Sequence, residues 1–167
     1  MTNIEIKTRF SAFSHAREVL SLLGGHCQGF EKQTDTYYQV DSGRLKIRER
    51  ASAGVELIQY VRDDVAGSRP SHYEVVPVKQ PDRVKTKLAR EHGVRIVVKK
   101  EREVWILDNV RLHLDQVEGL GSFLEIEAVL SDSVSEAKGK EQVHNLMTAL
   151  GIDTKDLVPQ SYCDLLQ

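Results

Sequence analysis

Charged and apolar residues alternate along several segments of this chain, and that alternation limits the possible folds more than any other feature. The clearest example is the segment 110–127, which contains two alternating stretches separated by a glycine-containing turn. Its charged or ionisable positions on the alternating face are Arg111, His113, Asp115, Glu125 and Glu127. A period of two residues is typical of a β-strand with one polar and one apolar face.

The same design recurs in strands that are far apart in the sequence. Segments 3–9, 44–50 and 95–107 also alternate, so the chain is expected to form a sheet of many two-faced strands. Basic residues dominate most of the charged faces, at Lys7, Arg9, Lys46, Arg48, Arg50, Lys100, Arg102 and Arg111. Acidic residues gather at Glu5, Asp115, Glu125 and Glu127.

Helical periodicity separates some of these strands. Helices are predicted around residues 11–23, 82–92 and 135–150, with a short helix in the tail 156–166. The count is about eight strands, which indicates an α+β fold with a mainly antiparallel sheet. Eight antiparallel strands can form a closed β-barrel with peripheral helices that holds one small ligand. We expect residues 1–167 to form one domain.

Composition excludes several classes of protein. Apolar runs are too short for a membrane span, and no signal segment opens the chain, so we expect no membrane partner. A net charge of −2 argues against a general nucleic-acid partner. The two cysteines suit a reducing cytoplasm. The sequence is compatible with either a monomer or a homodimer.

The charged faces allow two interpretations. In the first, they are solvated and the apolar faces form an ordinary core, which is the common meaning of alternation. In the second, they line a water-filled barrel and the apolar faces point outward beneath the helices. Segregation of charge favours the second, since clustered cations repel one another unless an anion binds there. Clustered carboxylates similarly favour a bound Mg²⁺ or Mn²⁺. Together they indicate a polyphosphate site.

At these residues the chain resembles the CYTH superfamily, whose fold is a triphosphate tunnel. The shared segments include 4–7, 34–38, 43–49, 100–102 and 111–127. Segments 111–127 and 161–166 are most similar to the class IV adenylyl cyclase branch. The superfamily also contains thiamine and inorganic triphosphatases.

The resemblance implies a role for particular residues. Those at phosphate-binding positions are Lys7, Lys46, Arg48, Arg62, Lys100, Arg102 and Arg111. Those at metal-binding positions are Glu5, Glu125 and Glu127, with Asp115 as either a further ligand or a residue that supports the ligands, and Mg²⁺ or Mn²⁺ is the implied cofactor. Catalytic roles are implied for Lys7 and Arg102. The family signature Glu-x-Glu-x-Lys is altered here, because Asn3 occupies its first position.

Three functions remain open at this point. The resemblance favours a divalent-metal-dependent adenylyl cyclase that converts ATP to cyclic AMP and pyrophosphate. A triphosphatase that hydrolyses an inorganic or organic triphosphate is the alternative, since one tunnel supports both reactions. A non-catalytic nucleotide or polyphosphate sensor is the third, and Asn3 is the residue that suggests it.

Overall fold

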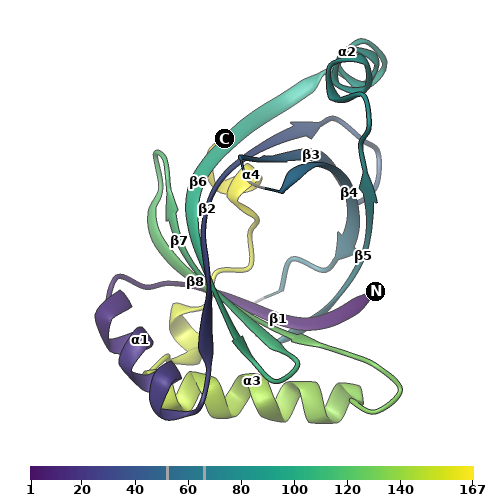
Figure 1. Cartoon of the computed structure of the whole chain (residues 1–167). Coiled ribbons are helices and arrows are strands. Elements are labelled where there is room, and N and C mark those ends of the chain that lie inside the picture. The colour runs from purple at the N-terminus through teal and green to yellow at the C-terminus, as the bar shows by residue number, and fades with distance from the viewer. Residues whose placement is uncertain (52, 66) are drawn as a thin grey trace.

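The computed structural model describes residues 1–51, 53–65 and 67–167. Its strands form one closed antiparallel barrel in the order β1-β5-β4-β3-β2-β6-β7-β8 (Figure 1). They are β1 (Thr2–Arg9), β2 (His26–Tyr38), β3 (Arg44–Arg50), β4 (Gly54–Arg62), β5 (Arg69–Pro77), β6 (Val94–Leu107), β7 (Val110–Val117) and β8 (Gly121–Val129). The prediction of an α+β fold with an eight-stranded barrel is confirmed.

Helices lie mainly outside the barrel. They are α1 (Phe13–Leu22), α2 (Pro81–His92), α3 (Glu136–Leu150), the 3₁₀ helix η1 (Thr154–Asp156) and α4 (Tyr162–Leu165). Figure 1 shows α1 and α3 against one side of the barrel and α2 at the far end of the long strand β6. None of the helices in the described ranges has the length and apolarity that a membrane crossing requires.

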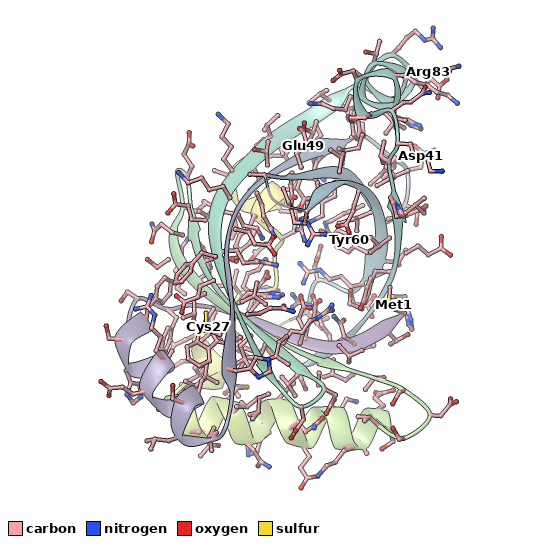
Figure 2. All side chains as sticks on the ribbon, in the orientation of Figure 1. Met1, Cys27, Asp41, Glu49, Tyr60 and Arg83 are labelled. Carbon is pink, nitrogen blue, oxygen red and sulfur yellow. The ribbon has the colours of Figure 1, made fainter. Side chains whose placement is uncertain are left out.

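The main hydrophobic core lies between the outer face of the sheet and the helices α1 and α3. Ile126 of β8 and Leu112 of β7 are fully buried there against Val143 and Leu146 of α3. Gly139 permits this close packing, because an added Cβ would come within 2.8 Å of Leu130. Since the apolar faces point outward, the alternating charged faces point into the barrel. Figure 2 shows the side chains that fill this interior, among them Tyr60.

Two strands of the barrel, β2 and β6, are much longer than the others. Segments 27–33 and 36–40 each have the composition of a strand, and the structure joins residues 26–38 in one continuous strand, β2. Segment 95–107 forms one strand, β6, which was one of the two predicted arrangements, the other being two separate strands. These two strands pair along nearly their whole length, with a bulge between Cys27 and Gly29. Continuous pairing explains why no turn interrupts either segment.

A second, smaller core sits at the C-terminal tail. Tyr162 of α4 packs edge-on against Phe123 of β8, with ring centroids 5.1 Å apart. The tail is held by a backbone hydrogen bond from Val158 N to Lys7 O and by ion pairs from Arg44 and Arg95 to Asp164. The expected short helix is therefore docked on the barrel, and its Tyr162 lines the barrel interior.

Candidate functional site: a charged cavity in the barrel

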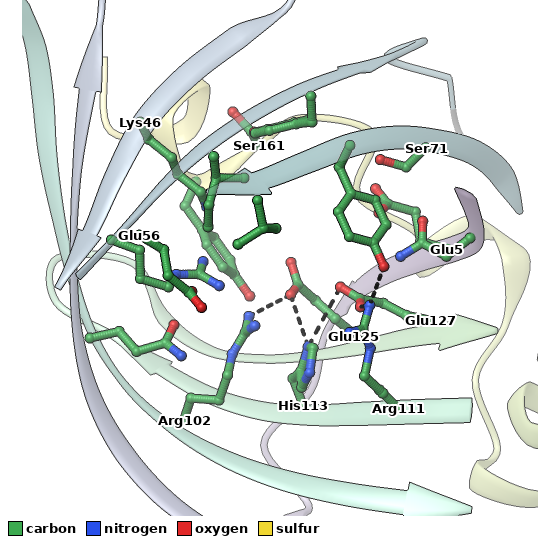
Figure 3. A pocket seen from close by; sticks show the side chains of 18 of the residues that line it. Glu5, Lys46, Glu56, Ser71, Arg102, Arg111, His113, Glu125, Glu127 and Ser161 are labelled. Carbon is green, nitrogen blue, oxygen red and sulfur yellow. Dashed lines mark hydrogen bonds and ion pairs between the residues drawn. The ribbon is translucent and has the colours of Figure 1, made fainter. Parts of the chain in front are cut away.

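The barrel encloses a cavity of about 430 Å³. This volume lies within the range of about 300–1,000 Å³ that is usual for small-molecule sites. Every site residue predicted from the sequence lines the cavity except Asp115. Each of the eight strands contributes residues to the cavity lining, as the alternation predicted. Figure 3 shows several of these side chains pointing toward one another.

One group of cations is organised by a buried aspartate on β2. The Asp35 carboxylate accepts hydrogen bonds from Lys46 Nζ at 2.7 Å and from Arg48 Nε at 2.8 Å. Burial alone raises the pKa of Asp35, but Arg48 and Lys46 bring that pKa well below its ordinary value. Asp35 thus stays charged and fixes the positions of both cations. Sequence reasoning missed this role, although Asp35 lies inside a segment that carries the family resemblance.

Asp115 on β7 organises a second group in the same way. Its carboxylate accepts from Arg102 Nε and Nη2, both at 2.6 Å, from Lys100 Nζ at 3.1 Å and from the Tyr162 hydroxyl at 2.8 Å. Its side chain is fully buried behind these partners. The structure therefore places Asp115 behind the cavity wall, where it supports Arg102, and not in the wall itself, where a metal ligand would lie. The physical reason is that lysine, arginine and tyrosine enclose its carboxylate completely, so that none of it faces the cavity.

The lysines of the cavity have unusual proton affinities. Burial lowers the pKa of Lys7 to about 8, and burial followed by the charge of Arg48 lowers the pKa of Lys46 to about 7. Lys7 lies 3.3 Å from Glu125 and donates a hydrogen bond to Gln160 O. An anion bound in the cavity would oppose these shifts, because it favours the protonated lysines.

Carboxylates gather on the β1 and β8 side of the cavity. Strand pairing places Glu5 of β1 opposite Glu127 and places Lys7 opposite Glu125. Arg102 donates to Glu125 at 2.5 Å, and Arg111 lies 2.9 Å from Glu127. Arg62 donates a hydrogen bond to Glu5. Burial raises the pKa of Glu5, and this effect is larger than the lowering by the charge of Arg62. The carboxylates are thus balanced by cations, and each is within the same cavity wall.

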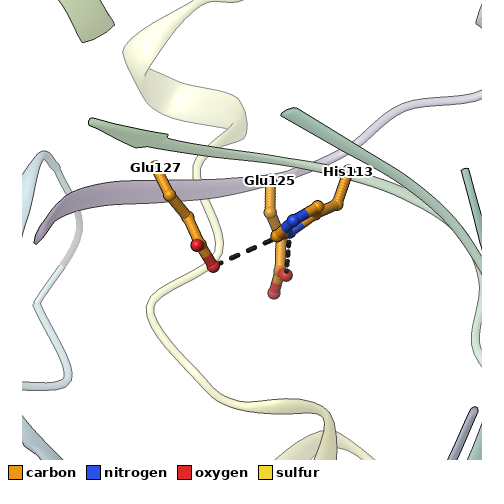
Figure 4. A group of neighbouring side chains, drawn as sticks. All are labelled: His113, Glu125 and Glu127. Carbon is orange, nitrogen blue, oxygen red and sulfur yellow. Dashed lines mark ion pairs between the residues drawn. The ribbon is translucent and has the colours of Figure 1, made fainter. Parts of the chain in front are cut away.

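These residues offer a suitable donor set for a divalent ion. One donor atom each from His113, Glu125 and Glu127 lie within 4.8 Å of one another (Figure 4). Glu5 lines the same cavity but does not belong to that close group. Among the described residues, the amide oxygen of buried Asn3 has no hydrogen-bond partner, so it remains able to act as an oxygen ligand.

Several residues in or beside the cavity were not predicted as site residues. Arg69 of β5 lies beside the cavity and not in its lining; it is buried, with its Nε 3.7 Å from Glu5. Tyr73 accepts a hydrogen bond from Arg111 at 3.0 Å. His113 was not among the predicted binding residues, and its Nδ1 has no hydrogen-bond partner among the described residues. Its position on the charged face of 110–127 was the available signal.

Comparison with known proteins identifies the family. A CYTH domain model matches residues 1–162. A Methanocaldococcus jannaschii protein provisionally named an adenylate cyclase is 27% identical over 99% of this chain and 98% of its own length. Adenylate cyclase CyaB of Aeromonas hydrophila is 26% identical over 74% of this chain and 62% of that protein. The solved structure of PH1012 from Pyrococcus horikoshii OT3 has a TM-score of 0.87 and 27% identity over 98% of both chains. The chain belongs to the CYTH domain family.

Proposed function

We propose that this protein is a divalent-metal-dependent enzyme that converts ATP to cyclic AMP and pyrophosphate. The supporting observation is the segregation of buried cations and carboxylates around one cavity. Lys46, Arg48 and Arg102 are the cations that would bind phosphate oxygens, since arginine forks match phosphate geometry. The names of the M. jannaschii and A. hydrophila relatives support cyclisation as the reaction.

The two halves of the cavity suit two different tasks. The Asp35 and Asp115 groups hold lysine–arginine pairs in fixed positions, so their charges need little rearrangement when the triphosphate binds. The carboxylates Glu125 and Glu127, with Glu5 nearby, would hold Mg²⁺ or Mn²⁺. When bound, the ion supplies charge neutralisation at the phosphate groups and polarises the bond that breaks.

In the proposed reaction, the ribose 3′-hydroxyl oxygen attacks the α-phosphorus. A new P–O bond forms, the bond to the bridging oxygen breaks, and pyrophosphate leaves with its negative charge against the cations. Lys7 is our candidate for receiving the hydroxyl proton, because a pKa of about 8 leaves part of its amine neutral near neutral pH. Arg102, which is held by Asp115 and Glu125, would stabilise the charge that develops on the phosphates.

Hydrolysis of the terminal phosphate is the second candidate. The same lysine can accept a proton from water, and the same cations can bind tripolyphosphate as well as ATP. The two reactions differ only in which phosphorus lies beside the nucleophile. Lys7, which lies 3.3 Å from Glu125, is therefore a candidate proton acceptor in either reaction.

Product analysis separates these candidates. The protein is incubated with ATP or tripolyphosphate plus MgCl₂ or MnCl₂, and the products are resolved by anion-exchange chromatography. Cyclic AMP with pyrophosphate supports the cyclase, and ADP or free phosphate supports the triphosphatase. Binding of ATP without either set of products would contradict both and indicate a sensor.

Glu127→Gln tests the assignment of the site within the same assay. Loss of a metal-binding carboxylate is expected to lower metal-dependent turnover at least about tenfold. Glu141→Gln on the exposed face of α3 is the matched control and should retain turnover. Equal turnover in Glu127→Gln and the wild type would contradict the site, provided that both fold with the same circular dichroism spectrum.

A further inference from the structure

The imidazole of His113 lies between two carboxylates of the cavity. Its Nδ1 is 3.6 Å from Glu125 Oε2 and 3.7 Å from Glu127 Oε1 (Figure 4). Strand pairing fixes this arrangement, because His113 of β7 is directly opposite Glu125 of β8. The His113 side chain is only 8% exposed and belongs to the cavity wall.

These distances are too long for hydrogen bonds. An N–H···O bond spans about 2.7–3.2 Å between heavy atoms. Among the residues that the structure describes, His113 Nδ1 has no hydrogen-bond partner at all. A buried polar group without a partner costs on the order of 1–3 kcal/mol, so such a group calls for an explanation.

The spacing is instead suited to an ion held between the donors. Ligand atoms about 2.1 Å from a metal can lie up to about 4.2 Å apart. The two measured separations, 3.6 and 3.7 Å, are below that limit.

The surrounding cations pair differently with the two glutamates. Arg111 is paired with Oε2 of Glu127, whereas His113 is the neighbour of Oε1. Arg102 donates to Oε2 of Glu125, and Lys7 lies 3.3 Å from Oε1 of the same residue. Glu127 Oε1 and His113 Nδ1 therefore form the more accessible donor pair, and Glu125 would join the set through a second lone pair of Oε2, which also accepts from Arg102.

We propose that His113 Nδ1 is a nitrogen ligand of the metal ion, together with Glu125 and Glu127, and that the site therefore prefers Co²⁺ and Mn²⁺ to Mg²⁺. Mg²⁺ binds oxygen ligands and retains water, whereas imidazole is a good ligand for first-row transition metals. Affinity for a site with nitrogen should also rise from Mn²⁺ to Co²⁺. This inference rests on the metal dependence in the proposed function, but it concerns metal binding without any substrate.

Metal affinity is the first test. Free Mn²⁺ is followed by electron paramagnetic resonance during titration of the wild-type protein, with Co²⁺ or Mg²⁺ added as competitors. We expect the order Co²⁺, Mn²⁺, Mg²⁺, with Mg²⁺ at least about tenfold weaker than Mn²⁺. His113→Gln should lose at least about tenfold in Mn²⁺ and Co²⁺ affinity, with little change for Mg²⁺. His144→Gln, at an exposed position of α3, is the matched control and should bind as the wild type does.

Pulsed electron paramagnetic resonance is the second test, and it uses the wild-type chain, so it does not depend on a variant that folds. Mn²⁺ bound to imidazole shows a ¹⁴N coupling, which should change to a ¹⁵N coupling when histidine is labelled with ¹⁵N. Mn²⁺ binding without nitrogen coupling, or equal competition by Mg²⁺, would overturn the proposal. These results would not contradict the proposed function, because turnover of a triphosphate is measured separately. Conversely, a protein that binds Mn²⁺ through nitrogen but turns over no triphosphate would contradict only the proposed function.

Discussion

The smallest unit of this site is a buried aspartate that holds a lysine and an arginine. Asp35 holds Lys46 and Arg48, while Asp115 holds Lys100 and Arg102. Neither aspartate lines the cavity, but their cations do. Fixed positions reduce the side-chain entropy that phosphate binding would otherwise cost. The aspartates therefore act as positioning residues.

The lowered pKa of Lys46 predicts a pH dependence of anion binding. In the empty protein this pKa is about 7, and a bound polyanion raises it, so binding takes up a proton above pH 7. Affinity for tripolyphosphate should be greatest when Lys46 is already protonated and should fall as pH rises from 7 to 9. Loss of the proton from one lysine can lower this affinity by at most about tenfold per pH unit.

Calorimetry in the presence of EDTA measures this dependence without turnover. Lys46→Arg keeps its charge throughout this range, because arginine does not lose its proton in proteins. That variant should show a shallower decline, with the remainder due to Lys7, whose pKa is about 8. An affinity that stays constant or increases toward pH 9 in the wild type would be the opposite of this expectation.

At the scale of secondary-structure elements, Asp115 connects three parts of the molecule. Its partners are Lys100 and Arg102 on β6 and Tyr162 on α4, while Asp115 itself lies on β7. Lys7 of β1 also contacts this cluster, with its Nζ 3.9 Å from the centre of the Tyr162 ring. The C-terminal tail is thereby joined to the barrel at the level of the cations.

Asp115→Asn should destabilise the protein while retaining the side-chain volume. It leaves Lys100 and Arg102 buried without their compensating charge, and loss of one partner of a buried ion pair costs about 3–5 kcal/mol. Urea unfolding measures the difference in free energy of unfolding. Asp132→Asn, at an exposed position, is the control and should change it little. Equal stability of the two variants would mean that Asp115 does not hold the cluster together.

The elements were predictable from alternation, and their partners were not. Alternation at 110–127 correctly assigned Glu125 and Glu127 to one face and Leu112 and Ile126 to the other, since the side-chain period is a property of the strand itself. Whether Asp115 meets a metal or an arginine depends on the register between β6 and β7, which places it opposite Arg102. Local sequence does not contain that register.

The same limit applies to residues that the sequence analysis missed. Arg69 follows a segment without periodicity, so no local pattern indicated that it would start β5 and approach Glu5. His113 was correctly placed on the charged face, but only the pairing of β7 with β8 brings it between two glutamates. The composition of the site was thus predictable, whereas the division of tasks among its residues required three-dimensional contacts.

At the scale of the whole molecule, the barrel reverses the usual arrangement of a small protein. Its hydrophobic core is outside the sheet beneath α1 and α3, and its interior is charged. Burying so many ions is costly unless each is paired, and the pairs described above supply that compensation. We interpret the arrangement as a barrel built to exchange some of its internal ion pairs for those of a polyanion.

The most direct test of this account is the affinity for tripolyphosphate at pH 7 with EDTA present, measured by isothermal titration calorimetry. Arg48→Met removes a charged donor from the cavity wall. Each hydrogen bond to a charged group contributes about 1.5–3 kcal/mol, so binding should weaken roughly 10- to 150-fold. Lys138→Met removes an exposed charge from α3 and serves as the control. The account predicts strong weakening in Arg48→Met and wild-type affinity in Lys138→Met, and it is contradicted if the two variants bind tripolyphosphate equally well.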